Sequence, residues 1–211
     1  MKHKPDHYTE RARKEGFPAR SVYKFDELQH RFSLVRRGDA VLDIGASPGS
    51  WTLRLLEIVG KGGVVVALDR KELPELSRAG KTAVCLQMDI TNPEEHGVLN
   101  RFAPFDAIVS DAAPNTSGHR TLDTARSAVI VESSLALTAR LLKSGGNAAF
   151  KLFQGGDEQS ILSTARTMFD KARIVKPKAC RDESFEVFLV CTGKKAGLDG
   201  SEAPSEAMHE A

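Results

Sequence analysis

The sequence predicts a single α/β domain in which a mostly parallel sheet of seven strands carries helices on both faces. Three observations predict it. Short apolar runs alternate with longer helical patterns from residue 40 onward. The apolar runs are continuous rather than alternating with polar residues, as expected of strands that are covered on both faces. A chain of 211 residues is long enough for one domain with a sizeable core.

The candidate strands are apolar runs bounded by glycine, proline or acidic residues. They span residues 40–46, 64–69, 83–88, 105–112, 147–153, 173–177 and 186–194. Candidate helices span 50–59, 124–142 and 158–169, and Gly145-Gly146 supplies a stop after the second of them. In sheets of this kind, ligands bind beyond the carboxyl ends of the strands, where the strand order switches. Residues at those ends are therefore the candidates for a functional site.

The two ends of the chain differ from this pattern. Residues 1–38 are rich in Arg and Lys and are predicted to be a basic helical extension packed on the domain of residues 39–195, broken near Gly16. Residues 196–211 hold four acids and no Lys or Arg, so we expect an acidic, disordered tail. The net charge of the chain is +2, and without the −4 of that tail residues 1–195 carry +6. A basic body is compatible with a polyanionic partner, although solvated lysines give the same sum.

Composition argues against several classes of protein. The first ten residues lack the apolar segment of a signal peptide. The longest apolar-rich stretch, residues 129–142, is interrupted by Glu132 and Arg140 and is too short to span a bilayer. The three cysteines form no CxxC pair, and no Cys/His cluster has metal-ligand spacing, so we expect no metal site. We expect a cytoplasmic protein without a membrane anchor, and a monomer, since no amphipathic stripe demands a partner.

The first strand runs into a loop of small residues, VLDIGASPGSW, at residues 41–51. Its glycines, Gly45 and Gly49, indicate a backbone that a ligand must approach closely. The loop reads GASPG rather than the GxGxxG of a dinucleotide fingerprint, so a dehydrogenase is disfavoured. No GK[ST] follows it, which excludes a P-loop. Ser50 is placed to cap the following helix.

Acids close the next two candidate strands. Asp69 ends VVVALD, where a carboxylate can accept both hydroxyls of a ribose; a solvated acid that starts a turn is the alternative. Asp89 follows AVCLQM, where a carboxylate can accept an adenine amino group; an N-cap or Asx turn is the alternative. A glycine loop and two acids at three strand ends together indicate an adenosine-containing ligand.

Four further charged residues stand in or beside apolar segments. Asp111 follows the run FDAIVS, and Lys151 lies inside NAAFKLF, where a lysine is uncommon unless it is paired. Glu186 opens the last apolar run, and Lys24 lies on the basic N-terminal helix. Each of the four also has a purely structural interpretation. Asp111 can be a partly buried acid with a partner, and Lys151 a lysine whose amine reaches solvent at the strand end. Glu186 can be a charge on an edge strand, and Lys24 a solvated lysine.

With these positions identified, the chain resembles the FtsJ/RrmJ-like ribose 2′-O-methyltransferases that act on large-subunit ribosomal RNA. The resemblance covers about residues 8–195 and is carried by the segments ARSVYKFDEL, VLDIGASPGSW, VVVALD, LQMDI, SDAAPNTSG, FKLFQGG and ESFEVFLVCTGKK. SDAAPNTSG and FKLFQG are specific to this family, whereas the glycine loop is shared more widely among methyltransferases. Two segments depart from the family pattern: RKELPEL after Asp69 and ITNPEE after Asp89.

The resemblance implies a Rossmann-like methyltransferase domain, S-adenosyl-L-methionine as methyl donor and a catalytic tetrad of Lys24, Asp111, Lys151 and Glu186. It implies that the donor is bound by Gly45, Ala46, Ser47, Pro48, Gly49, Trp51, Asp69, Asp89, Ile90 and Asp111. The implied substrate is a uridine of 23S-type RNA in a 50S-type subunit, methylated late in ribosome assembly. The alternatives are a transfer RNA substrate, or an RNA-binding assembly factor with little turnover.

Methyl transfer to a ribose hydroxyl requires a base, because the hydroxyl holds its proton tightly at neutral pH. The oxygen, the methyl carbon and the sulfur must also be collinear. Lys151 is the candidate base: burial and the nearby cation Lys24 favour loss of its proton, whereas Asp111 and Glu186 oppose it. The alternative is that a charged Lys151 orients a lone pair of the hydroxyl while the proton leaves late.

The basic N-terminal region is compatible with an RNA substrate. Phosphate contacts are expected from some of the basic residues Arg11, Arg13, Lys14, Arg20, Arg31, Arg36 and Arg37. The aromatic residues that can stack on bases are Tyr8, Phe17, Tyr23 and Phe25, although core packing is expected for most of them.

Overall fold

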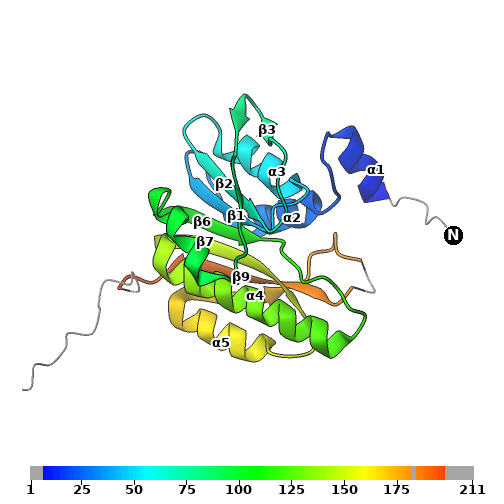
Figure 1. Ribbon diagram of the computed structural model, residues 1–211, viewed down its shortest axis with the longest axis vertical. Helices are drawn as coiled ribbons and strands as arrows, with labels where there is room; N and C mark the ends of the chain where they lie inside the picture. Colours follow the sequence, from blue (N-terminus) through cyan, green and yellow to red (C-terminus); the bar gives the residue numbers. More distant parts are fainter. Residues whose placement is uncertain (1–6, 182–183, 198–211) are drawn as a thin grey trace, which may run out of the picture.

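Seven strands form one sheet in the computed structural model, which describes residues 7–181 and 184–197 (Figure 1). The order across the sheet is β5-β2-β1-β6-β7-β9-β8. The bounds of these strands are β1 (Ala40–Ile44), β2 (Val64–Asp69), β5 (Val84–Gln87), β6 (Phe105–Ser110), β7 (Leu142–Phe153), β8 (Phe169–Val175) and β9 (Glu186–Lys194). A small antiparallel pair is formed by β3 (Ser77–Arg78) and β4 (Lys81–Thr82).

The sheet is parallel over most of its width. β1 pairs in parallel with β2 and β6, β2 pairs with β5, and β6 pairs with β7. Only β9 runs against its neighbours β7 and β8 within the described sheet. The strand order switches at β1, because the chain proceeds from β1 to β2 on one side and later returns to β6 on the other. The predicted α/β fold with a mostly parallel seven-stranded sheet is confirmed.

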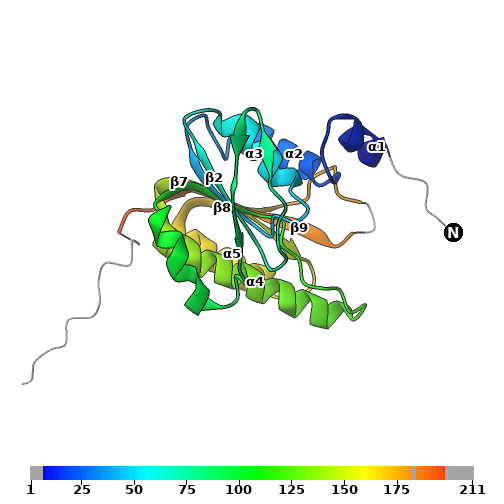
Figure 2. The same ribbon diagram turned by 45° about the horizontal axis from the view of Figure 1, so that its top comes forward.

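Helices cover both faces of the sheet, as Figure 2 shows. Their bounds are α1 (His7–Lys14), α2 (Val22–Phe32), α3 (Ser50–Val59), α4 (Arg120–Leu141) and α5 (Glu158–Met168), with a 3₁₀ segment, η1 (Pro93–Arg101), after β5. On β1, Val41 packs with α2 and α3, whereas its neighbour Leu42 packs with α4 and α5. Each strand therefore contributes to two apolar layers, which is why the strands appear in the sequence as unbroken apolar runs.

Helix α4 ends within one residue of its expected end, but the glycine pair is not what stops it. It ends at Leu141, and Leu142, already extended, begins β7, so that Gly145 and Gly146 lie inside this strand. A Cβ at Gly146 would lie 2.8 Å from Leu142 Cδ1 and 2.9 Å from the carbonyl oxygen of Asp106. Gly146 is thus needed for close packing of β7, and the expected role of the glycine pair as a helix stop is wrong.

Ser50 does not cap α3. The cap position is Gly49, whose φ of +110° is readily available only to glycine, and Ser50 is the first helical residue. The Ser50 hydroxyl oxygen instead accepts a hydrogen bond of 2.8 Å from the backbone N–H of Ala19. This contact ties the segment that leads into α2 to the start of α3.

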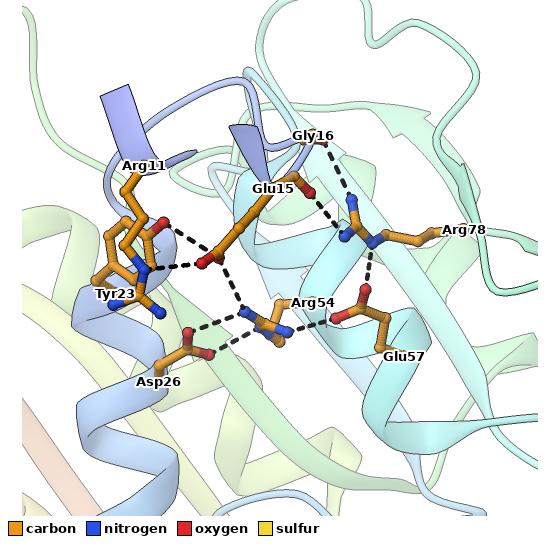
Figure 3. Close-up of polar contacts among 8 residues, drawn as sticks. All are labelled: Arg11, Glu15, Gly16, Tyr23, Asp26, Arg54, Glu57 and Arg78. Atoms are coloured by element: carbon orange, nitrogen blue, oxygen red, sulfur yellow. Dashed lines mark hydrogen bonds and ion pairs between the residues drawn. The ribbon is translucent and has the colours of Figure 1, made fainter. Parts of the chain in front are cut away.

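The N-terminal helices are joined to the domain by apolar and charged contacts. The side chains of Val22, Phe25 and Leu28 on α2 are fully buried against the sheet and α3. On the outer side, Arg54 of α3 forms ion pairs of 2.9 Å with Asp26 and 2.6 Å with Glu57 (Figure 3).

The same charged cluster reaches α1 (Figure 3). Glu15 accepts hydrogen bonds from Arg11 at 2.7 Å and from the Tyr23 hydroxyl at 3.1 Å. Arg78 on β3 pairs with Glu57 and also donates to the backbone carbonyl of Glu15 at 2.9 Å and to that of Gly16 at 3.2 Å. The break between α1 and α2 is therefore held by side chains of α3 and β3.

The expected acidic tail lies outside the described residues, apart from Ala196 and Gly197. No helix within residues 7–181 and 184–197 is long and apolar enough to cross a membrane. The described residues also contain no group of three or more His, Cys, Asp or Glu side chains arranged to hold a metal ion.

Candidate active site

A large cavity opens at the carboxyl ends of β1, β2, β5 and β6, where the strand order switches. Its volume is about 550 Å³. Of the residues predicted to bind the cofactor or act in catalysis, it is lined by Gly45, Ser47, Asp69, Asp89, Ile90, Asp111 and Lys151. Sequence positions 45 to 151 are thus brought to one cavity by the parallel strands, as the sequence pattern predicted.

The glycine loop forms one wall of this cavity. Gly45 has a φ of +73°, and a Cβ there would lie 2.5 Å from both the Cα and the Cβ of Ala112. The backbone N–H of Ser47 donates to Asp69 Oδ2 at 3.0 Å, and the N–H of Lys71 donates to Asp69 Oδ1 at 2.9 Å. Asp69 therefore holds the loop in place, and each of its oxygens keeps a second lone pair for a ligand.

Asp89 forms the Asx turn that was one of its two expected roles, and it also lines the cavity. Its Oδ1 accepts hydrogen bonds from the backbone N–H of Thr91 at 2.9 Å and from the Thr91 hydroxyl at 2.7 Å, which is an Asx turn. Burial raises the pKa of Asp89, but these hydrogen bonds and the charge of Arg70 outweigh it, so the pKa lies below its usual value. Asp89 is therefore an ionised acceptor on the cavity wall at neutral pH.

The four residues of the expected tetrad form two ion pairs. Lys151 Nζ lies 3.0 Å from Asp111 Oδ1 and donates to the backbone carbonyl of Asp111 at 2.5 Å. Lys24 Nζ lies 2.5 Å from Glu186 Oε1. These contacts join α2, the end of β6, β7 and β9. The register of β7 and β9 pairs Phe153 with Glu186, which places Glu186 on the same face of the sheet as Lys151.

Charges within the tetrad keep Lys24 and Glu186 ionised. Burial lowers the pKa of Lys24, but the charges of Asp111 and Glu186 together outweigh it and the pKa is raised. Burial raises the pKa of Glu186, but the charge and hydrogen bond of Lys24 outweigh it and the pKa is lowered. Burial, followed by the charge of Glu186, raises the pKa of the Cys180 thiol to about 12, so Cys180 remains a thiol that donates to Glu186.

The tetrad lies between two hollows. Asp111 and Lys151 line the large cavity, whereas Lys24 and Glu186 line a second hollow of about 360 Å³. Arg20, Arg181 and Ser184 also line this second hollow. One pair of the tetrad thus faces each hollow, an arrangement that suits the meeting of two ligands.

Some of the predicted cofactor residues lie away from the large cavity. Trp51 is only 2% exposed, its ring contacts Phe25 and Phe188 with centroids 5.0 and 5.7 Å away, and its Nε1 donates to the Ser21 carbonyl. Its indole is therefore a core side chain that does not line the cavity, and its assignment as a cofactor contact stays a prediction.

Three other residues of the glycine loop do not line the cavity. Ala46 is buried, Pro48 is exposed, and a Cβ on Gly49 would lie 2.4 Å from Leu76 Cδ2. Of these, Gly49 shapes the loop because it also provides the positive φ at the cap of α3. The residues of the loop that line the cavity are therefore Gly45 and Ser47.

Two residues near the site were missed by the sequence reasoning. Cys180 was not singled out among the three cysteines, and no local pattern indicates its hydrogen bond to Glu186. Asp43 stands in the motif VLDIGASPGSW and was not singled out, although it is fully buried inside an otherwise apolar strand. A charged residue in such a run is a signal that applied to Lys151 and applies equally to Asp43.

The fold and the cavity together define the class of protein. A solved ribosomal RNA methyltransferase from Plasmodium falciparum superposes with a TM-score of 0.73 over 84% of this chain and 98% of that chain, at 23% sequence identity. At this identity the likeness shows the fold alone. The chain has the fold of an α/β methyltransferase domain, with a ligand cavity at the switch point of the sheet.

Sequence comparison gives the particular family. The family model described as FtsJ-like methyltransferase matches residues 17–194. A protein of Treponema denticola named ribosomal RNA large subunit methyltransferase E is 42% identical over 186 residues, covering 88% of this chain and 93% of that protein. A protein of the same name from Syntrophobacter fumaroxidans is 41% identical over 192 residues, with the same coverage. The chain belongs to the FtsJ-like methyltransferase family, and the resemblance noted from its motifs is confirmed.

Proposed function

We propose that this enzyme transfers a methyl group from S-adenosyl-L-methionine to the ribose 2′-hydroxyl of a uridine in large-subunit ribosomal RNA. The observation that carries the proposal is the pair of lysine–carboxylate contacts between the two hollows. The names of the relatives, ribosomal RNA large subunit methyltransferase E, support the substrate.

The large cavity fits the proposed donor. S-adenosyl-L-methionine supplies a methyl group activated by a positively charged sulfur. Asp69 would accept hydrogen bonds from its ribose hydroxyls and Asp89 from its adenine amino group, since both acids line the cavity and keep free lone pairs. The close packing of Gly45 on Ala112 leaves the backbone of the loop bare on the cavity side.

The tetrad would position and deprotonate the ribose hydroxyl. Lys151 is the tetrad amine on the cofactor side, and it is held by the carbonyl and the carboxylate of Asp111. Lys24 and Glu186, both ionised, border the second hollow. We assign to Lys151 the proton transfer and to the Lys24–Glu186 pair the placement of the sugar, since general-base catalysis requires a group within hydrogen-bond reach.

The second hollow would receive the target nucleotide. Arg20 lines it while also donating to the Ala179 carbonyl at 2.6 Å, and Arg181 is exposed there. Arg13 and Lys14 of α1 are exposed and make no ion pair with other described residues, so they are free to meet phosphates. Phe17, Tyr23 and Phe25 are buried, which removes them as stacking partners for bases.

We further propose that the protein works as a monomer in the cytoplasm, where ribosomal subunits mature, and that its substrate is the assembled 50S-type subunit. Two alternatives are tested by the same experiment. One is methylation of transfer RNA, and the other is an assembly factor that binds RNA with little turnover.

The test measures transfer of labelled methyl from S-adenosyl-L-methionine to three substrates: 50S-type subunits, free ribosomal RNA and bulk transfer RNA, all from cells lacking the modification. The product nucleotide is then mapped. We expect label on a ribose of large-subunit RNA, strongest with subunits. Label confined to transfer RNA would keep the chemistry and overturn the substrate. Cofactor binding without label on any RNA would favour the assembly factor.

A further inference from the structure

A fully buried carboxyl group lies directly behind the large cavity. Asp43 is on β1, one residue before Ile44 and two before Gly45, both of which line the cavity, and its side chain is 0% exposed. Its Oδ2 accepts a hydrogen bond of 2.6 Å from the Thr52 hydroxyl of α3. Its Oδ1 has no hydrogen-bond partner among the described residues. Buried acids that are ionised normally have more partners than this.

The charges that act on Asp43 come from acids at the cavity. These are Asp69 at the end of β2 and Asp111 after β6, and both line the cavity. From α3, the group that faces Asp43 is the uncharged Thr52. Burial raises the pKa of Asp43 to about 7. The hydrogen bond from Thr52 opposes this rise, and the smaller effects of the charges of Asp111 and Asp69 add to it.

The contact with Thr52 serves both protonation states. A hydroxyl donates to an ionised carboxylate and accepts from a protonated carboxyl group, so Asp43 can change its charge without moving. A cation in the cavity would attract the negative charges of Asp69, Asp111 and Asp43 together. It would therefore favour the ionised form of Asp43.

The methyl donor and its product differ in that one charge. Transfer moves the methyl group from sulfur to oxygen, the sulfur keeps the bonding electron pair and loses its positive charge, and the hydroxyl proton leaves to the base. The donor thus enters the cavity as a sulfonium, and the product leaves it as a neutral thioether.

We propose that Asp43 senses this charge: it is ionised while the sulfonium donor occupies the cavity and takes up a proton from solvent when the cavity holds the thioether product. The inference rests on the proposed function, since it requires S-adenosyl-L-methionine as donor. The consequence is that the protein discriminates between the donor and the product. The protein binds the donor more tightly than the product by a ratio that grows as the pH rises through 7.

The test is titration calorimetry of S-adenosyl-L-methionine and of S-adenosylhomocysteine, in buffers that differ in ionisation enthalpy. If the cation lowers the pKa of Asp43 by one unit, donor binding at pH 7 releases about 0.4 proton per site, and the donor-to-product affinity ratio rises up to about tenfold between pH 5 and pH 8.5. The Asp43→Asn variant should show neither effect, because an amide keeps the hydrogen bond and cannot ionise.

A matched control and a second measurement complete the test. The control is Asp106→Asn. Asp106 lies near the start of β6, at the end of the sheet away from the cavity, and accepts a hydrogen bond from the backbone N–H of Ala40. This variant should keep both the proton release and the pH-dependent affinity ratio. If Asp43→Asn fails to fold, the carbonyl infrared band of a protonated carboxyl group in the wild-type protein should disappear when the donor binds and persist with the product.

The outcomes separate the two hypotheses. Donor binding with the same proton release in wild type and Asp43→Asn, or an infrared band that ignores the donor, overturns the role of Asp43 and leaves the proposed function standing. Absence of donor binding to the wild-type protein overturns both.

Discussion

Two charged clusters meet the same helix, α2, and differ in how they are built. Asp26 and Tyr23 belong to the outer cluster of Figure 3, which ties α1, α2, α3 and β3 together. Lys24, between them in sequence, belongs to the tetrad. The side chain of Arg54 in the outer cluster is 24% exposed, whereas that of Lys151 in the tetrad is 9% exposed.

The difference lies in what the charges face. In the outer cluster, Arg54 has three acids within 4.0 Å, and Arg78 is occupied by Glu57 and two backbone carbonyls. Its groups are directed at one another. In the tetrad, each lysine has one carboxylate partner, and each pair borders a hollow. The comparison indicates that the outer cluster stabilises the fold, while the tetrad holds charge at the border of two hollows.

The largest expected effect is on the tetrad. Lys151→Met should lower kcat for methyl transfer by about 10²–10⁴-fold, the usual contribution of a positioned acid or base. The dissociation constant of S-adenosyl-L-methionine should change only a few-fold, because the acids expected to bind it are intact. Single-turnover kinetics and calorimetry on the same preparation measure the two quantities. Near-full turnover would remove Lys151 from the mechanism.

A second variant at this position separates the two roles considered for the amine. Lys151→Arg keeps the positive charge but introduces a group that stays protonated at any working pH. If Lys151 is the base, the arginine variant should be as inactive as Lys151→Met. Retention of a substantial part of kcat would show that a charged group orienting the hydroxyl is sufficient.

Prediction from the sequence worked where the signal is local or periodic. The apolar runs located the strands, α3 was predicted with its observed bounds, and charged residues in apolar segments marked Lys151 and Asp111. It did not show which residues are held by tertiary contacts. Trp51 has the sequence context of a ligand residue, yet its indole packs between Phe25 and Phe188 from distant elements. Similarly, Gly146 is a glycine because of Asp106, forty residues earlier.

Paired charges were the other part that the sequence did not resolve. Which lysine pairs with which acid depends on the register of β7 with β9 and on the placement of α2, and neither is encoded locally. The seven basic residues considered for RNA illustrate this. Arg11 pairs with Glu15, just after α1, and Arg31 pairs with Glu27 on α2. The seven residues together therefore contribute less positive charge to a phosphate-binding surface than their number suggests.

The next largest effect is on stability, and it concerns the buried Asp43, which has no cationic partner in either cluster. The folded-state pKa of Asp43 is raised to about 7, so the folded protein binds more protons than the unfolded chain between about pH 4 and pH 7. Its free energy of unfolding should therefore fall as the pH rises through this range and then level off. Asp43→Asn should remove this contribution and be more stable than wild type by about 2–4 kcal/mol at pH 8.

Urea denaturation of wild type and Asp43→Asn at pH 5 and pH 8 measures this effect. Taking the difference in the free energy of unfolding between the two proteins cancels the contributions of the other titrating groups. We expect the advantage of Asp43→Asn to be larger at pH 8 than at pH 5. An equal difference at both pH values would show that Asp43 does not titrate in this range, and would also weaken its assignment as a charge sensor.

The smallest effect is expected in the outer cluster, and it tests the comparison most directly. Arg54→Met should lower the free energy of unfolding by about 1–3 kcal/mol, because it leaves Asp26 and Glu57 without their shared cation in a partly buried position. Arg31→Met is the matched control: Arg31 pairs with Glu27 at 3.3 Å on the exposed side of α2, and its removal should change stability by less than about 0.5 kcal/mol.

Under conditions where both variants are folded, kcat should stay within a few-fold of wild type. If Arg54→Met instead lowers kcat as strongly as Lys151→Met while the protein remains folded, the outer cluster is part of the catalytic apparatus, acting through the position of Lys24 on α2, and the division between the two clusters is wrong.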